Sequence, residues 1–199
     1  MEPVVWVLIA IGILIVVAVA AFVISRRRSE RLRERFGPEY ERVVQEADGR
    51  RRAEADLAAR EKRVERLEIR PLDADARDGF ARSWRDAQAR FVDQPAESIR
   101  AADRLVTEVM RQRGYPMEDF EQRAADISVD HPSVVENYRA AHAISLASDH
   151  GQASTEDLRQ AIVHYRSLFE VLLESGEPEE HRVVDLTDQD TDRARRYPA

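Results

Sequence analysis

The chain has 199 residues, a net charge of −7, 35% charged residues and no cysteine. This length allows one modest domain besides a short anchor. The lack of cysteine excludes disulfides, thiol catalysis and thiolate metal sites. Thirty of the 31 basic residues are arginine, with Lys62 the exception, which we interpret as a GC-rich coding bias.

Charge is distributed unevenly along the chain. Residues 26–70 carry 15 basic and 11 acidic side chains, whereas residues 71–175 carry 12 basic and 19 acidic ones. An acidic body repels phosphate backbones, so nucleic acid is not an expected partner.

The most distinctive segment is residues 4–24, a run of 21 residues without a charge. A helix of that length covers about 30 Å, the thickness of a bilayer's hydrocarbon core. Trp6 lies near one end, where aromatic residues anchor a span at the membrane interface. The segment therefore predicts one transmembrane helix, with residues 1–25 as the anchor.

The flanks of this segment predict its direction. No arginine or lysine precedes it, whereas six arginines follow: Arg26, Arg27, Arg28, Arg31, Arg33 and Arg35. Positive charge stays on the cytoplasmic side, so we expect a single-pass inner-membrane protein with its N-terminus outside and residues 26–199 in the cytoplasm. The arginines would fix topology, bind anionic headgroups, or do both.

A cleaved signal peptide is the competing interpretation of the same segment. The sequence Ala18-Val19-Ala20 has the form of a cleavage site, but no positive region precedes the apolar run. Gly12 and the alanines could support homodimerisation in the membrane, although no Gly-x-x-x-Gly motif is present.

Residues 26–70 form a charged, basic connector with a helical pattern. Gly37-Pro38 breaks the helix, Asp48-Gly49 is a weak point, and Arg70-Pro71 ends the segment. Glu46, Arg50 and Arg60 fall at the seam positions of a coiled-coil register, so a long coiled coil is not supported. We expect a solvated helical stalk or a helix laid on the body.

Residues 71–175 show five helical segments and no strand pattern. The first spans about 75–91 and places Phe80, Trp84 and Phe91 on one face, which is a candidate core or partner-binding face. The others begin near Gln94-Pro95, Met117, Asp130 and Ser154. Residues 176–199 form an acidic tail that we expect to be disordered.

The predicted fold class is therefore all-α, with one N-terminal transmembrane helix, a charged helical connector and a compact bundle of four to five helices.

No motif for catalysis, metal binding or cofactor binding is present. The five histidines show neither His-x-x-x-His nor His-Glu-x-x-His spacing, and the acids between Glu118 and Asp130 lack the pattern of a calcium loop. No cofactor and no catalytic residue are expected.

The stretch RQRGYPMEDFEQRAADISVDHPSVVENYRAAHAI, with FGPEY and STEDLRQAIVHYRSLFEVLL, resembles single-span membrane proteins of high-GC bacteria. That group has no assigned activity, so the resemblance implies no functional residue. One N-terminal span leading into charged helix is similar, more loosely, to the b subunit of ATP synthase, but the compact body after Pro71 departs from that pattern.

We therefore expect a membrane-tethered, non-enzymatic helical domain that binds the lipid bilayer and another protein. The alternatives are an enzyme or enzyme-regulating helical domain at the membrane, for which a pocket lined by His142, Tyr138 and acids would be the sign, and a helical protein secreted after signal cleavage.

Overall fold

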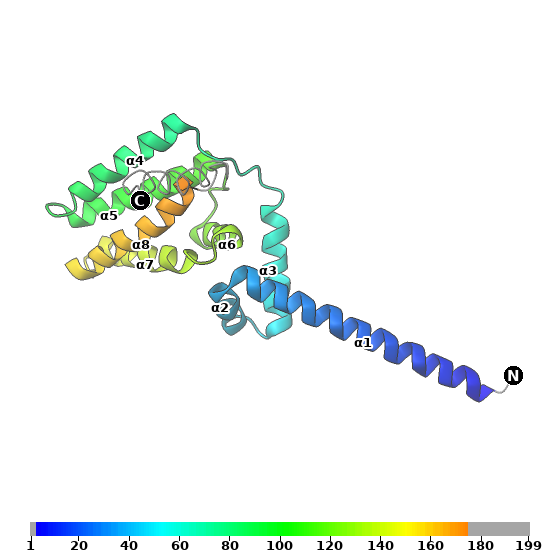
Figure 1. Cartoon of the computed structure of the whole chain (residues 1–199). Helices are drawn as coiled ribbons and strands as arrows, with labels where there is room; N and C mark the ends of the chain where they lie inside the picture. Colours follow the sequence, from blue (N-terminus) through cyan, green and yellow to red (C-terminus); the bar gives the residue numbers. More distant parts are fainter. Residues whose placement is uncertain (1–2, 175–199) are drawn as a thin grey trace, which may run out of the picture. The chain divides into compact units, whose positions relative to one another are not determined.

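The structure is a computed structural model that describes residues 3–174, except for the side chains of residues 3–5 and 7–10. Within that part of the chain every regular element is a helix, which confirms the all-α prediction (Figure 1). The eight helices are α1 (Pro3–Phe36), α2 (Pro38–Glu46), α3 (Arg50–Val64), α4 (Ala74–Ala89), α5 (Pro95–Arg113), α6 (Phe120–Asp130), α7 (Val135–Asp149) and α8 (Thr155–Glu174). The predicted acidic tail, residues 176–199, lies outside the described residues.

The chain divides into two compact units. Unit 1 comprises Met1–Arg66 with Ala125–Ser133, and unit 2 comprises Leu67–Ala124 with Val134–Ala199. The predicted connector thus belongs largely to a folded unit, which also takes the last residues of α6 from the middle of the predicted body.

Unit 1 is built around the last turns of α1. Gly37, at φ 47°, turns the chain, and Pro38 starts α2 in the first-turn position that suits proline. The buried apolar side chains come from α1, α2, α3 and the end of α6: Leu32, Phe36, Tyr40, Val43, Ala53, Leu57, Val64, Ile127 and Val129. The apolar residues of the connector therefore pack against helices of the same chain, and not against a second chain as in a coiled coil.

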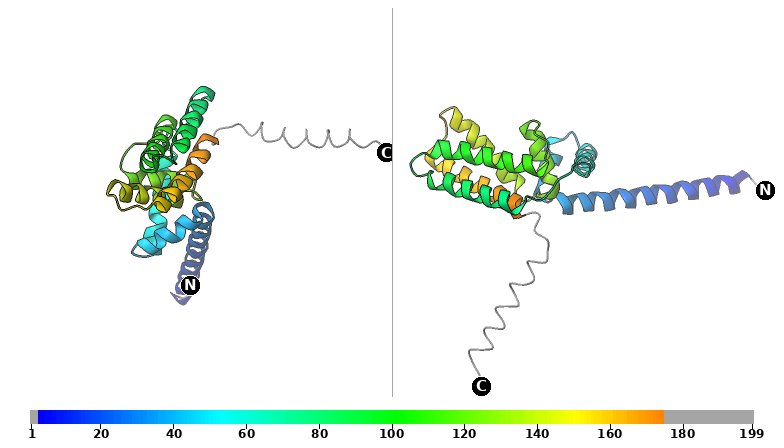
Figure 2. Two further views of the ribbon diagram at one scale, coloured as in Figure 1. Left: turned by 90° about the vertical axis from the view of Figure 1, so that its left-hand side faces the viewer. Right: turned by 90° about the horizontal axis from the view of Figure 1, so that it is seen from above.

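The N-terminal part of α1 extends away from the rest of unit 1, and neither α2 nor α3 lies beside it (Figures 1 and 2). Its large apolar side chains between residues 11 and 24 are 41–70% exposed. Among the described side chains, no helix combines the length and the apolar character that crossing a bilayer requires. The predicted span begins at Val4, and the side chains of residues 4, 5 and 7–10 lie outside that described set.

Unit 2 is a helical bundle of α4, α5, α7 and α8, which confirms the predicted bundle (Figure 2). Helices α4 and α5 form one hairpin, α7 and α8 form another, and α5 packs on α8. The core contains Ala102, Val106, Val109 and Met110 of α5, Leu158, Ala161, Tyr165, Leu168, Phe169 and Leu172 of α8, and Tyr138 and Ala141 of α7. Burial of these apolar faces is the main stabilising term.

The ends of these helices follow from local chemistry. Asp73 caps α4 by accepting a hydrogen bond from the Ala76 backbone N–H at 2.7 Å. Ser154 and Asp157 form a reciprocal capping box at the start of α8, with bonds of 2.8 and 3.2 Å. Gly114 ends α5 in the left-handed conformation, at φ 95°. The sequence indicates the signals at Ser154 and Gly114, whereas the predicted start near residue 75 lies two residues after the Asp73 cap.

Candidate functional site

The arginines of α1 fall into two groups. Arg31 and Arg35 approach Glu61 of α3 at 3.8 and 3.3 Å, and Arg33 donates to Glu41 at 3.0 Å. Those three arginines therefore make ion pairs within unit 1, a role that the sequence did not predict for them.

The other three lie nearer to the apolar stretch. Arg26 pairs with Glu30, one helical turn along α1, at 3.2 Å. Arg27 and Arg28 are exposed and have no ion-pair partner among the described residues. Of the six arginines, these three therefore lie closest to the apolar stretch and make no ion pair with another helix among the described residues.

Buried carboxylates are the polar counterpart of the arginines in unit 1. Glu39 is fully buried at its side chain and binds Arg42 at 2.6 Å and Arg60 at 2.9 Å. Asp126, from α6, lies 3.2 Å from Arg63. A carboxylate buried without a cation would be costly, so the pairs that Glu39 and Asp126 make with α3 favour the packing of α2 and the end of α6 on that helix.

Glu54 of α3 connects three elements of unit 1. Its Oε1 atom accepts hydrogen bonds from the Ser29 hydroxyl at 2.6 Å, the Tyr40 hydroxyl at 2.9 Å and Arg50 Nε at 3.0 Å. Burial alone would raise the pKa of Glu54, but the bonds from Ser29, Tyr40 and Arg50 together hold it below the ordinary value. The ionised carboxylate therefore joins α1, α2 and the start of α3.

The predicted aromatic face of α4 contributes mainly to the core. Trp84 is 5% exposed and stacks on Phe169 of α8, with ring centroids 4.5 Å apart, whereas Phe80 and Phe91 are half-buried. Along this contact a groove of about 440 Å³ runs between α4 and α8. Its floor is apolar, from Ala81, Trp84, Phe169 and Leu173, and its rim carries charged residues: Arg77, Asp78, Arg85, Arg166, Glu170 and Glu174.

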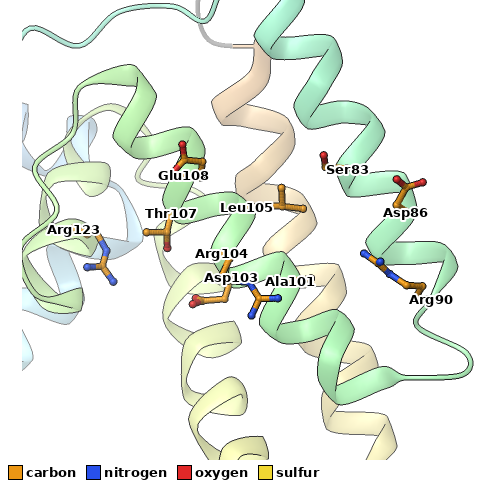
Figure 3. Close-up of a pocket in the computed structure, with 10 residues that line it drawn as sticks. All are labelled: Ser83, Asp86, Arg90, Ala101, Asp103, Arg104, Leu105, Thr107, Glu108 and Arg123. Atoms are coloured by element: carbon orange, nitrogen blue, oxygen red, sulfur yellow. The ribbon is translucent and has the colours of Figure 1, made fainter.

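A second, open cleft of about 730 Å³ lies over the outer face of α5, between α4 and α6 (Figure 3). Ser83, Asp86 and Arg90 line it from α4, and Arg123 lines it from α6; α5 supplies Ala101, Asp103, Arg104, Leu105, Thr107 and Glu108. Arg90 and Arg104 have no side-chain partner among the described residues.

A polar cluster adjoins this cleft. Asp103 accepts a hydrogen bond of 2.7 Å from the Tyr165 hydroxyl, and His142 Nδ1 lies 3.8 Å from the same carboxylate oxygen. The His142 ring stacks on Phe120, with ring centroids 3.7 Å apart.

Burial alone would raise the pKa of Asp103, but His142 and Tyr165 together hold it below its ordinary value. Burial and the nearby Asp103 charge raise the pKa of Tyr165. The pair is therefore an ionised carboxylate and a protonated phenol at neutral pH.

Arg123 links the cleft to the Tyr138 side of the cluster. It donates to the Tyr138 hydroxyl at 3.5 Å and to the Glu118 carbonyl at 2.6 Å, so its guanidinium is held at the cleft wall. Sequence reasoning missed Asp103 and Arg123. The available signal was an acid directly beside the apolar stripe of α5, between Ala102 and Val106.

Within the described residues, no group of three or more histidine or acidic side chains could hold a metal ion. Comparisons with protein-family models, curated proteins and solved structures found no match.

Proposed function

We propose that this chain is a single-pass membrane protein that holds a non-enzymatic, helical interaction domain at the cytoplasmic face of the inner membrane. Residues 4–24 would cross the bilayer. The observation that carries the proposal is the exposure of apolar side chains on α1: residues such as Leu14, Val16 and Phe22 are 67–70% exposed on a helix that has no charge before Arg26. Large exposed apolar surfaces mark membrane or partner contacts.

Helix α1 also supports the proposal by its continuity. The helix that carries the apolar stretch continues to Phe36, and its last turns form part of the unit 1 core through Leu32 and Phe36. A span joined rigidly to a folded unit would hold that unit close to the lipid surface. The arginines that follow the stretch support a cytoplasmic position for this unit, because positive charge stays on that side of a membrane.

The groove between α4 and α8 is the proposed site for the protein partner. An apolar floor with a charged rim suits an amphipathic helix that lays its apolar face on Trp84, Phe169 and Leu173. Tethering to the membrane raises the local concentration of both partners, so a weak affinity would suffice.

The first test is membrane placement. We expect the full chain to stay in the membrane fraction after alkaline carbonate extraction, and a chain lacking residues 1–25 to be released. A periplasm-activated reporter fused after Ala199 should stay inactive; an active reporter would overturn the proposed orientation.

The second test is partner capture from membranes by crosslinking and co-purification. Charge reversal at the groove rim, Arg85→Glu, should weaken capture, whereas the matched reversal Arg159→Glu on the outer face of α8 should not. Equal capture by both variants would show that the partner does not bind at the groove.

The cleft over α5 favours a second candidate, a ligand-binding or enzyme-regulating domain. Arg123 is held rigidly at its wall, and the ionised Asp103 lies beside it with Tyr165. Recovery of a bound small molecule with the purified chain, lost in Asp103→Asn, together with no captured protein, would favour this candidate over the adaptor.

A further inference from the structure

The structure brings a second arginine triplet beside the arginines of α1. Arg50, Arg51 and Arg52 form the first turn of α3, more than twenty residues after Arg28 in the sequence. Ser29 and Arg50 donate to the same oxygen of Glu54, at 2.6 and 3.0 Å. The first turn of α3 therefore lies directly beside α1 at Ser29.

This position is close to the end of the apolar stretch. Ser29 follows Ile24 by five residues, which is about 7 Å along a helix at 1.5 Å per residue. An extended arginine side chain spans a comparable distance, so guanidinium groups from both helices can reach the level at which lipid headgroups would begin.

The arginines of the second triplet differ in what they already bind. Arg50 is occupied, since its Nε donates to both Glu54 and the Tyr40 hydroxyl at 3.0 Å. Arg51 is exposed and has no ion-pair partner among the described residues. Arg52 is 73% exposed at its side chain and has one long contact, 3.3 Å, to the highly exposed Asp48.

Charge at this end of unit 1 is strongly positive. The cluster contains six arginines, at positions 26–28 and 50–52, against the three carboxylates of Glu30, Asp48 and Glu54. By contrast, the arginines further along α1 form ion pairs with Glu41 and Glu61. Free positive charge is therefore concentrated next to the apolar stretch.

We infer that Arg51 and Arg52 of α3 join Arg26, Arg27 and Arg28 of α1 in one binding surface for anionic phospholipid headgroups. This inference rests on the proposed membrane placement. The two groups of arginines are far apart in the sequence, and it is the folding of the connector that brings them into one surface. Each basic residue close to an anionic membrane contributes about 1 kcal/mol, which is about fivefold in lipid association.

The test measures lipid selectivity of the full chain reconstituted into phosphatidylcholine vesicles. Spin-labelled phosphatidylglycerol is compared with spin-labelled phosphatidylcholine by electron paramagnetic resonance, which reports the fraction of each lipid immobilised by the protein. We expect the wild type to prefer phosphatidylglycerol, and the double variant Arg51→Glu/Arg52→Glu to lose at least about fivefold of that preference.

The matched control is Lys62→Glu/Arg66→Glu, which makes the same change in charge at the other end of α3. Lys62 lies eleven residues beyond Arg51, about 16 Å along the helix. We expect the control to keep most of the preference. Circular dichroism checks that both variants retain their helices.

The outcomes separate the two proposals. A wild-type chain that does not resist carbonate extraction from the vesicles contradicts the membrane placement itself. A chain that inserts, prefers phosphatidylglycerol, and keeps this preference in Arg51→Glu/Arg52→Glu overturns the inference alone. Equal loss in the control pair also overturns it, because net charge would then explain the preference.

Discussion

At the scale of single residues, Glu54 of unit 1 offers a direct test, because one of its carboxylate oxygens accepts hydrogen bonds from three donors. Glu54→Gln keeps the size of the side chain but removes its charge. We expect a loss of about 1–3 kcal/mol in the free energy of unfolding, since Ser29, Tyr40 and Arg50 lose their charged acceptor. Urea unfolding of the full chain in detergent micelles, followed by circular dichroism, measures this.

The control is Glu65→Gln, which removes an exposed charge just after α3. Its effect should stay within about 0.5 kcal/mol, as for most surface changes. Equal urea midpoints for Glu54→Gln and the wild type would show that the three bonds do not support unit 1.

Two glycines of unit 2 make a second residue pair. A Cβ atom at Gly114 would lie 2.6 Å from the Glu68 carbonyl oxygen, at a positive φ of 95°. Gly114→Ala should therefore destabilise unit 2 by about 1–3 kcal/mol. Gly79→Ala, inside α4 and free of close contacts, should stabilise it by about 0.5–1 kcal/mol. Thermal unfolding measures both, and shifts of the same sign would contradict the account of Gly114.

At the scale of elements, α1 combines an apolar part with an arginine-rich part that has two roles. Arg31→Gln/Arg35→Gln would leave Glu61, which is 10% exposed at its side chain, without its cations. We expect unit 1 to lose about 1–3 kcal/mol of stability while the topology stays unchanged.

Arg27→Gln/Arg28→Gln should do the reverse. These exposed residues have no ion pair to lose within the described chain, so stability should stay the same, whereas the proposed membrane orientation should become less strongly biased. Urea unfolding and a reporter fused after Ala199 separate the two effects. A stability loss in both variants would show that the six arginines act as one group.

The helices of unit 2 were predictable because their ends and faces depend on neighbouring residues. Ser154 with Asp157 marks the start of α8, and Gly114 marks the end of α5. Unit 1 was not predictable in this way. Its core needs Ile127 and Val129 from a distant part of the chain, and pairs such as Arg63 with Asp126 depend on which helices meet in space. The periodicity of one segment contains no such information.

The candidate sites show the same limit. The sequence indicated the aromatic face of α4 because its residues share a helical spacing, and Trp84 does line the α4–α8 groove. Asp103 and Arg123 come from two helices, α5 and α6, so no local pattern joins them at the cleft.

For the whole molecule, stability should depend on pH. The pKa values of Glu54 and Asp103 lie below their ordinary values of 4.5 and 3.8, so the folded chain binds fewer protons than the unfolded chain in acid. Their contribution is complete above those ordinary values and is lost as pH falls through the lowered pKa values.

In alkali the direction reverses. The pKa of Tyr165 lies above its ordinary value of 10.0, so its contribution is complete below pH 10 and declines as pH rises further. Urea midpoints between pH 3 and 11 measure both the acid and the alkaline loss of stability. Asp103→Asn should reduce the loss of stability in acid. If Asp103→Asn lost stability in acid in the same way as the wild type, the role of Asp103 would be contradicted.

Membrane placement is the claim on which the rest of the function depends, and the absence of cysteine makes it directly measurable. Single cysteines are introduced as Glu2→Cys and Gln152→Cys and treated in intact spheroplasts with a membrane-impermeant maleimide. The proposed placement predicts labelling of Glu2→Cys in intact spheroplasts, and labelling of Gln152→Cys only after lysis. Labelling of Gln152→Cys in intact spheroplasts, with Glu2→Cys protected, would contradict it.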